Sequence, residues 1–251
     1  MFDAHYDEAG GKPLDKGRRP YMNRGPQITE RIESYLQING QQGIVRFDQA
    51  QRFLGHLSPE PDKMKQSGIL SVERTRKILR PWLDEELLLY RVFYARQKGG
   101  LWLTSKGLKY ANLNLRYYEP SPASLPHLYA INDIRLLIAT RRPHDTWRSE
   151  RELRAEQNAH PKGSTSPHLP DAELISTNGN VNAIEVEITV KSEKRLEEII
   201  FDLAGNKRYN TIWYFLPESV YIVVKKTVDK LPTEHRKRFV FYTLEGEPYS
   251  I

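Results

Sequence analysis

Two short apolar segments that carry acidic residues are joined by a turn sequence typical of a β-hairpin. Residues 171–176 read DAELIS, residues 182–190 read NAIEVEITV, and the sequence TNGN lies between them. An Asn-Gly pair favours the tight turns that connect two antiparallel strands. We therefore predict a β-sheet that contains this hairpin, with acidic side chains on both of its strands.

The segments around the hairpin alternate between helical and extended patterns. Apolar residues recur at helical spacing in 127–142, and 191–204 is also predicted to be a helix. Further strands are predicted at 147–154, 211–216, 220–225 and 236–246. A helix, three strands, a second helix and more strands in this order indicate an α/β sheet with helices on its faces.

The N-terminal half has a different order, in which three short helices precede a two-stranded hairpin. Asp48 and Ser71 are predicted to be N-caps, and Pro81 to kink the third helix or to end it early. The order is that of a winged helix-turn-helix domain. The predicted helices span 27–39, 48–54 and 71–83, with a short strand at 44–47 and a hairpin whose turn is QKGG at 97–100.

The positive charge of the chain is concentrated in its first half. Residues 1–120 contain 20 Lys and Arg against 14 Asp and Glu, and residues 121–251 contain 18 of each. A basic surface attracts polyanions, and a helix fits the major groove of DNA, which is about 12 Å wide. A winged helix that contacts proteins is the alternative. The predicted contacts with double-stranded DNA are Arg74, Arg76, Lys77, Arg80, Arg91, Arg96 and Lys98.

Composition divides the chain into four parts. We predict a flexible arm at 1–26, the winged helix at 27–115, a proline-rich linker at 116–126 and the α/β domain at 127–251. The chain has no Cys, which excludes disulfides and thiolate metal sites. No apolar run approaches the roughly 18 residues of a membrane helix. We expect a cytoplasmic protein that does not interact with membranes.

The hairpin places carboxylates where they could share a cation. Strand alternation sends Glu185 and Glu187 to one face, and Asp171 begins the neighbouring strand close to Glu185. Mg²⁺ and Mn²⁺ take oxygen ligands of this kind, and such an ion activates water for attack on a phosphate. The other interpretation is that these acids face solvent on a half-exposed strand. His160 and His168 lack further ligands and are predicted to be surface residues.

These residues resemble the PD-(D/E)xK nuclease superfamily, whose core is a helix, a three-stranded meander and a second helix. Pro170-Asp171 stands at the PD position and 185–187, Glu-Val-Glu, at the (D/E)xK triplet. The resemblance implies that Asp171 and Glu185 bind the metal. Glu187 stands where the superfamily usually has Lys, and it would act as a third ligand or a base.

Two further positions follow from the same resemblance. Lys191 lies four residues after Glu187 and would supply a substitute ammonium group against a phosphate or the transition state. The counterpart of the superfamily's helical acid would be Asp133, with Glu150 as the competing choice.

The order of four motifs is similar to a narrower group, the replication-relaxation family of plasmids and integrative elements. It implies a DNA-binding protein of a mobile element that acts in replication, relaxation or mobilisation, with Mg²⁺ or Mn²⁺ only if it cuts. The alternative is a non-catalytic regulator or accessory factor whose second domain mediates dimerisation or contacts with other mobile-element proteins. The motifs are LWLTSKGLKYA at 101–111, W..ER.LR at 147–154, PD.EL at 170–174 and EVE.T at 185–189.

Overall fold

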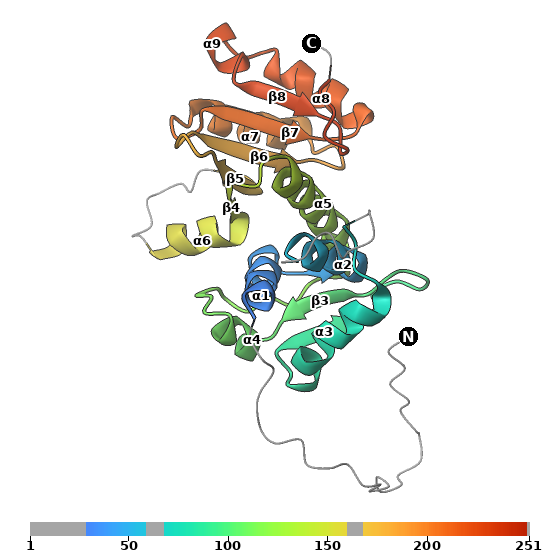
Figure 1. Cartoon of the computed structure of the whole chain (residues 1–251). Coiled ribbons are helices and arrows are strands. Elements are labelled where there is room, and N and C mark those ends of the chain that lie inside the picture. The colour runs from blue at the N-terminus through green and yellow to red at the C-terminus, as the bar shows by residue number, and fades with distance from the viewer. Residues whose placement is uncertain (1–28, 59–67, 160–167, 250–251) are drawn as a thin grey trace, which may run out of the picture.

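The chain folds into a mixed α+β structure with two sheets (Figure 1). The structure is a computed structural model that describes residues 29–58, 68–159 and 168–249. The predicted arm at 1–26 lies outside the described residues. Within the described ranges, no helix combines the length and the apolar character needed to cross a membrane.

The N-terminal part builds a three-stranded sheet against four helices. Strand β3 lies in the centre and pairs antiparallel with β1 on one side and with β2 on the other. The elements are α1 (Glu30–Gln42), β1 (Val45–Arg46), α2 (Phe47–His56), α3 (Val72–Asp84), β2 (Leu88–Arg91), β3 (Gly100–Leu103) and α4 (Ser105–Tyr110).

The starts of the helices follow local capping, with one correction to the predictions. The Ser71 side chain accepts a hydrogen bond from the Arg74 backbone N–H, which confirms Ser71 as the N-cap of α3. Asp48 is not an N-cap, because α2 begins one residue earlier and the Asp48 carboxylate binds the Arg46 guanidinium instead. Pro81 lies inside α3, which continues to Asp84.

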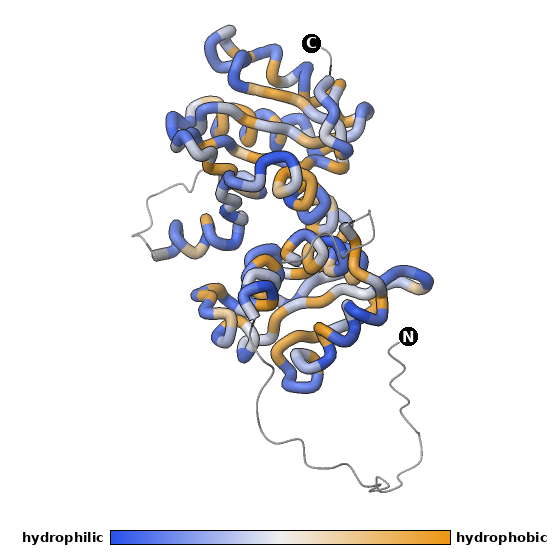
Figure 2. The backbone as a smooth tube through the Cα atoms, in the orientation of Figure 1, coloured by the Kyte–Doolittle hydropathy of each residue, from blue (hydrophilic) through white to orange (hydrophobic). Residues whose placement is uncertain are grey.

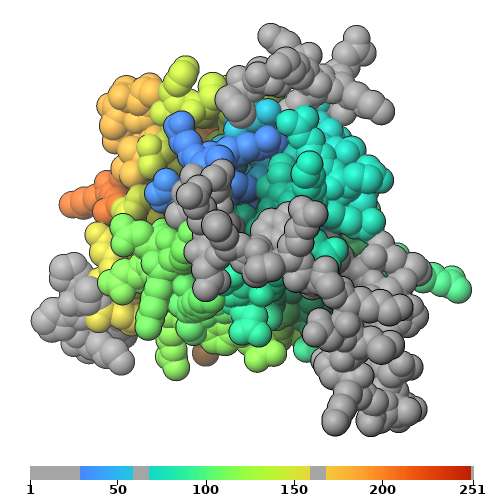
Figure 3. Space-filling view, turned by 60° about the horizontal axis from the view of Figure 1, so that its bottom comes forward, coloured from blue at the N-terminus to red at the C-terminus, as the bar shows by residue number. Residues whose placement is uncertain are grey.

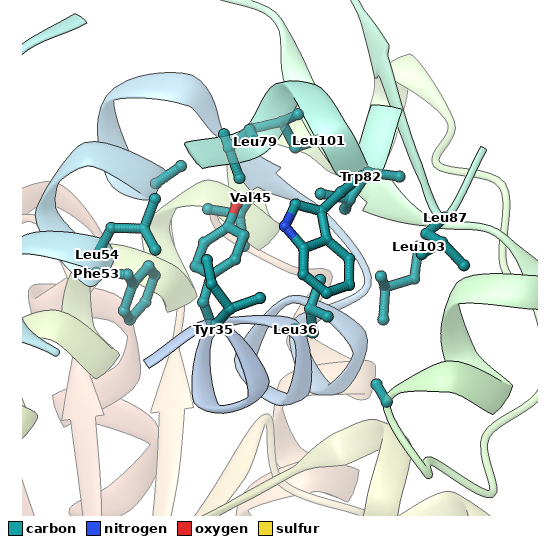
Figure 4. Packing of buried hydrophobic residues seen from close by; sticks show 14 of the residues in the cluster. Tyr35, Leu36, Val45, Phe53, Leu54, Leu79, Trp82, Leu87, Leu101 and Leu103 are labelled. Atoms are coloured by element: carbon teal, nitrogen blue, oxygen red, sulfur yellow. The ribbon is translucent and has the colours of Figure 1, made fainter. Parts of the chain in front are cut away.

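The core of the N-terminal part lies between its helices and its sheet (Figure 4). Trp82 of α3 and Tyr35 of α1 are almost fully buried at its centre, together with leucines from the helices and strands. Burial of side chains of this size contributes about 1.5–3 kcal/mol each. The apolar side of α3 is thereby fixed against α1, and its other side is left outward.

The C-terminal part builds a five-stranded mixed sheet in sequence order, β4-β5-β6-β7-β8. The first three strands are antiparallel, whereas β7 and β8 run parallel to β6. The elements are η2 (Pro122–Ser124), α5 (Leu125–Arg141), β4 (Thr146–Ser149), α6 (Glu150–Ala159), β5 (Ala172–Ile175), β6 (Val181–Val186), α7 (Glu193–Gly205), β7 (Thr211–Phe215), α8 (Glu218–Val228), α9 (Thr233–Arg236) and β8 (Phe239–Tyr242).

Helices cover both faces of this sheet. On one face α5 packs through Ile134 and Ile138 against Ile184 and Val186 of β6. On the other face α7 and α8 pack against residues of β6, β7 and β8. The alternation predicted for β6 is therefore confirmed, since Ile184 and Val186 lie on the α5 face and Ala183 lies on the opposite one.

Two predicted strands are wrong. The segment 220–225 belongs to α8, in which Val220, Val224 and Val228 are buried at helical spacing. The predicted strand at 147–154 ends at Ser149, because the Glu152 carboxylate accepts hydrogen bonds from the backbone N–H and the hydroxyl of Ser149. These bonds resemble a capping box and start α6 at Glu150.

Buried polar side chains join the two parts of the chain. Asn132 of α5 is fully buried and donates to the backbone carbonyl of Ile44 and to the Gln49 side chain. Its own amide oxygen accepts from Gln42 of α1. Arg135 adds hydrogen bonds to Gln42, so α5 is bound directly to α1 and α2. The two parts are thus in direct contact through side chains outside the predicted linker.

Candidate functional site

Asp171 and Glu185 come together at one end of the β5–β6 pair. Ala172 of β5 lies opposite Ile184 of β6, so the next pair in this direction is Asp171 and Glu185. The Asp171 Oδ2 accepts a hydrogen bond of 2.8 Å from the Val186 backbone N–H. The hairpin therefore places both carboxylates on one face of neighbouring strands, as the sequence predicts.

Glu185 and Glu187 are buried, so the interpretation that they face solvent is wrong. Glu185 is 4% exposed and Glu187 is 6% exposed, because their face of the sheet is covered rather than open. Glu187 forms an ion pair with Lys191, which lies four residues further along the chain. The Lys191 ammonium thus neutralises the Glu187 carboxylate.

Two histidines complete this cluster, and sequence reasoning missed both. His127 of α5 places its Nε2 3.0 Å from Asp171 Oδ1, and the Nε2 of His168 lies 2.8 Å from Glu185 Oε1. The prediction that His168 is a surface residue is wrong, because its side chain is only 17% exposed. We call Asp171, Glu185, His127 and His168 the acid–histidine cluster. His160 lies outside the described residues.

Hydrogen bonds, charges and burial within the acid–histidine cluster raise the pKa values of His127, His168 and Glu185. The hydrogen bond to Asp171 raises the pKa of His127. Burial lowers the pKa of His168, but the bond to Glu185 and its negative charge outweigh burial and raise it. Burial, with the nearby charge of Asp171, raises the pKa of Glu185. The folded protein therefore holds a proton on His127, and one shared by the His168–Glu185 pair, more tightly than the free side chains would.

A buried tyrosine hydroxyl lies on the next strand. Tyr214 of β7 is paired in register with Glu185 and is 1% exposed. Among the described residues its hydroxyl has no hydrogen-bond partner. Burial, together with the charges of Glu185 and Asp171, raises the pKa of Tyr214 well above its usual range. A buried hydroxyl of this kind usually finds a water or an ion as its partner.

The carboxylates of Asp171 and Glu185 suit a hard cation that keeps several water ligands better than a cation held by protein ligands alone. Asp171 and Glu185 offer two carboxylates, and Mg²⁺ is commonly held by one or two carboxylates with water in its remaining positions. In 29–58, 68–159 and 168–249 there is no group of three or more His, Asp or Glu side chains arranged to hold a metal ion. A bound Mg²⁺ or Mn²⁺ would polarise a phosphate and activate water.

Neither candidate for a helical acid directs its carboxylate at the acid–histidine cluster, although the Glu150 backbone N–H donates to the Asp171 carbonyl at 2.9 Å. The Asp133 carboxylate accepts a hydrogen bond of 2.8 Å from Arg52 of α2. Glu150 forms an ion pair with Arg154 within α6. It is His127, on the first turns of α5, that contacts Asp171. The position on α5 nearest Asp171 therefore holds an imidazole rather than a carboxylate.

The predicted recognition helix α3 contains both hydrophilic and hydrophobic residues (Figure 2), and part of it lies at the surface in the view of Figure 3. Thr75, Leu79 and Trp82 of α3 are buried, whereas the predicted contacts Arg74, Lys77 and Arg80 are exposed. Among the described residues, no carboxylate pairs with Arg74 or Lys77, while Arg80 pairs with Asp84 at 3.5 Å. Arg76 is half-buried. Arg74 and Lys77, which have no carboxylate partner within the described residues, thus both lie in the N-terminal half of α3.

The hairpin between β2 and β3 carries the other predicted cations. Arg91, Arg96 and Lys98 are all exposed. Arg96 adopts a left-handed backbone conformation with φ of 63°, which turns the chain back toward β3. Gly99 and Gly100 are buried where the strand begins. These cations therefore lie on the same N-terminal part of the chain as α3.

The raised pKa of His127 predicts a pH-dependent stability. Because its folded-state pKa lies above the unfolded value of about 6.5, His127 stabilises the fold below that pH, and this contribution is lost as the pH rises through the folded-state pKa. His127→Gln should therefore destabilise the protein more at pH 6 than at pH 8.5, as measured by urea denaturation. The exposed His144→Gln is the control, and an equal loss at both pH values would contradict the assignment.

Comparisons with family models, with curated proteins and with solved structures give no match.

Proposed function

We propose that the protein binds double-stranded DNA through α3 and the β2–β3 hairpin, in the manner of a winged helix. The single observation that carries this proposal is that Arg74 and Lys77 are exposed without a described acidic partner on a helix whose other side is fixed in the core. Phosphates would neutralise these charges, and release of counterions would drive binding.

The arrangement of the N-terminal elements supports this role. Three helices and a short strand precede the hairpin, and α3 is the third of these helices. In winged-helix proteins the third helix enters the major groove while the hairpin contacts the backbone beside it. Both elements here carry exposed cations, Arg74 on α3 and Arg96 on the hairpin.

The test is duplex binding by Arg74→Ala/Lys77→Ala. We expect binding to weaken by about tenfold or more, and the slope of log K against log salt to become shallower by about 2, because two phosphate contacts are lost. Fluorescence anisotropy of a labelled duplex at several salt concentrations measures both quantities. The control Lys194→Ala/Lys226→Ala changes the net charge equally and should bind as the wild type. Unchanged affinity and slope in the α3 variant would refute the proposal.

A second candidate function is metal-dependent cleavage of DNA by the C-terminal part. The observation that favours it is that the partly buried Asp171 and the buried Glu185 lie side by side, with the Tyr214 hydroxyl on the next strand unpartnered among the described residues. The order α5, β4, β5, β6, α7 also supports it, since a helix, an antiparallel meander and a helix form the PD-(D/E)xK core, here with α6 added after β4.

If the C-terminal part cleaves DNA, the two carboxylates, Lys191 and the two histidines would have separate roles. Asp171 and Glu185 would hold Mg²⁺ or Mn²⁺, and Lys191, already beside Glu187, would place positive charge near a phosphate. His127 and His168 would orient the two carboxylates through their hydrogen bonds. A role in the replication or mobilisation of a mobile element would follow from site-specific nicking.

The alternative to cleavage is a non-catalytic regulator or accessory factor. It is favoured by the observation that Asp171, Glu185 and Glu187 each already contact a potentially cationic side chain of the same chain. In that case the acid–histidine cluster would stabilise the sheet end, and the C-terminal part would mediate dimerisation or contacts with partner proteins.

A further inference from the structure

We infer that a second DNA-binding surface lies at the far end of the molecule, where α9 meets the end of α7. It consists of Lys207, Arg236 and Lys237, which are all exposed, and we call it the basic corner. The ligand is the phosphate backbone of a second double-stranded DNA segment. This inference rests on the proposed DNA binding by α3.

Neighbouring side chains fix the geometry of the basic corner. Arg238 donates hydrogen bonds to the backbone carbonyls of Ala204 at 2.7 Å and Asn206 at 2.8 Å. The Nδ1 of His235 lies 3.0 Å from the same Ala204 carbonyl. These bonds satisfy the carbonyls at the C-terminal end of α7 and hold α9 against it. Lys207 is thereby placed beside the segment that carries Arg236 and Lys237.

The charges of the basic corner are available to a ligand. Among the described residues, Lys207, Arg236 and Lys237 have no carboxylate partner, and Arg236 contacts only the Thr233 hydroxyl. Glu234 is the one acid of α9, so the corner keeps an excess of positive charge.

Other cations near the basic corner are, by contrast, paired with carboxylates. Arg208 donates twice to the buried Glu173 carboxylate, at 2.5 and 2.7 Å. Lys230 binds Glu193 and Glu197. These side chains are already neutralised by the protein itself. The unpaired charge of this region is therefore concentrated in the basic corner, within a C-terminal half that carries no net charge.

The position of the basic corner indicates a separate DNA segment. In Figure 1, α9 and α3 lie at opposite ends of the molecule. An exposed Arg next to a Lys suits phosphate oxygens, because the guanidinium donates to them in pairs and the ammonium adds charge. One protein molecule would then connect two duplexes.

A capture experiment with the full chain tests this inference. A biotinylated 20-base-pair duplex on beads is loaded with protein and washed, and a fluorescent duplex is then added. We expect wild type to retain the fluorescent duplex and Arg236→Ala/Lys237→Ala to retain it at least about tenfold less, because two phosphate contacts are lost. The variant should still bind the bead duplex as the wild type does. Lys194→Ala/Lys226→Ala, with the same change in charge, should capture normally.

The outcomes separate the two claims. Full capture by Arg236→Ala/Lys237→Ala would overturn the inference that the basic corner binds DNA. If only Arg74→Ala/Lys77→Ala loses capture, a dimer that binds both duplexes through α3 would explain the result, and this too would overturn the inference. Wild type that binds the bead duplex but captures nothing would also overturn it and would leave the α3 proposal intact. Wild type that binds no duplex at all would refute the α3 proposal and this inference with it.

Discussion

Replacing Asn132 by Leu is expected to lower the free energy of unfolding by about 3 kcal/mol. Asn132 is fully buried, donates to the Ile44 carbonyl at 2.8 Å and to Gln49 at 3.1 Å, and accepts from Gln42 at 2.8 Å. Leu has a similar volume, so the main loss is of hydrogen bonds. Each buried group left without its partner costs about 1–3 kcal/mol.

The size of this loss in stability depends on which hydrogen bonds the partners of Asn132 retain in the Leu variant. The Gln49 Oε1 still accepts from the Arg46 backbone N–H, which keeps the loss below the sum of three groups, whereas the Ile44 carbonyl and the Gln42 Nε2 lose their partner. Urea denaturation followed by circular dichroism measures it, with Asn114→Leu, an exposed loop position, as the control. A loss below about 0.5 kcal/mol would show that Asn132 does not join α5 to α1 and α2.

Asp171→Asn and Glu185→Gln are each expected to reduce metal-dependent nicking of supercoiled DNA by at least about 100-fold. Removal of a metal ligand should cost more than the 10- to 100-fold that loss of an outer hydrogen-bond partner costs. The assay compares Mg²⁺ with Mn²⁺ on supercoiled, linear and branched DNA. Asp133→Asn is the matched control, because this acid pairs with Arg52 instead of the acid–histidine cluster.

Two results would decide against cleavage at Asp171 and Glu185. Cutting that survives in both Asp171→Asn and Glu185→Gln would place the active site elsewhere. No cutting by the wild type on any substrate, with duplex binding intact, would leave the non-catalytic regulator or accessory factor as the function. In that case the acid–histidine cluster stabilises the end of the β5–β6 pair.

Local signals in the sequence were sufficient for much of the fold. The TNGN turn predicted the β5–β6 hairpin and brought Asp171 next to Glu185, because hairpin register follows from the turn. Ser71 predicted the start of α3, since its side chain caps the helix within three residues. Such signals need no knowledge of distant contacts.

Other features depend on contacts that the sequence alone does not reveal. The apolar run at 220–225 fits a buried strand and a helix equally well, and only the fuller segment Glu218–Val228 shows the helical spacing of Val220, Val224 and Val228. The Ser149–Glu152 pair was a readable capping signal for α6. His127 could not be assigned, because it meets Asp171 from 44 residues away through the packing of α5.

The most direct test of DNA binding by α3 is a cross-link from its exposed face. The chain has no Cys, so Lys77→Cys can be labelled at a single position with a photoreactive maleimide. Illumination in the presence of a labelled duplex should give a protein–DNA adduct from this position and none from the equally exposed Lys226→Cys. An adduct from Lys226→Cys with none from Lys77→Cys, while the duplex remains bound, would contradict the assignment of α3 as the DNA-binding helix.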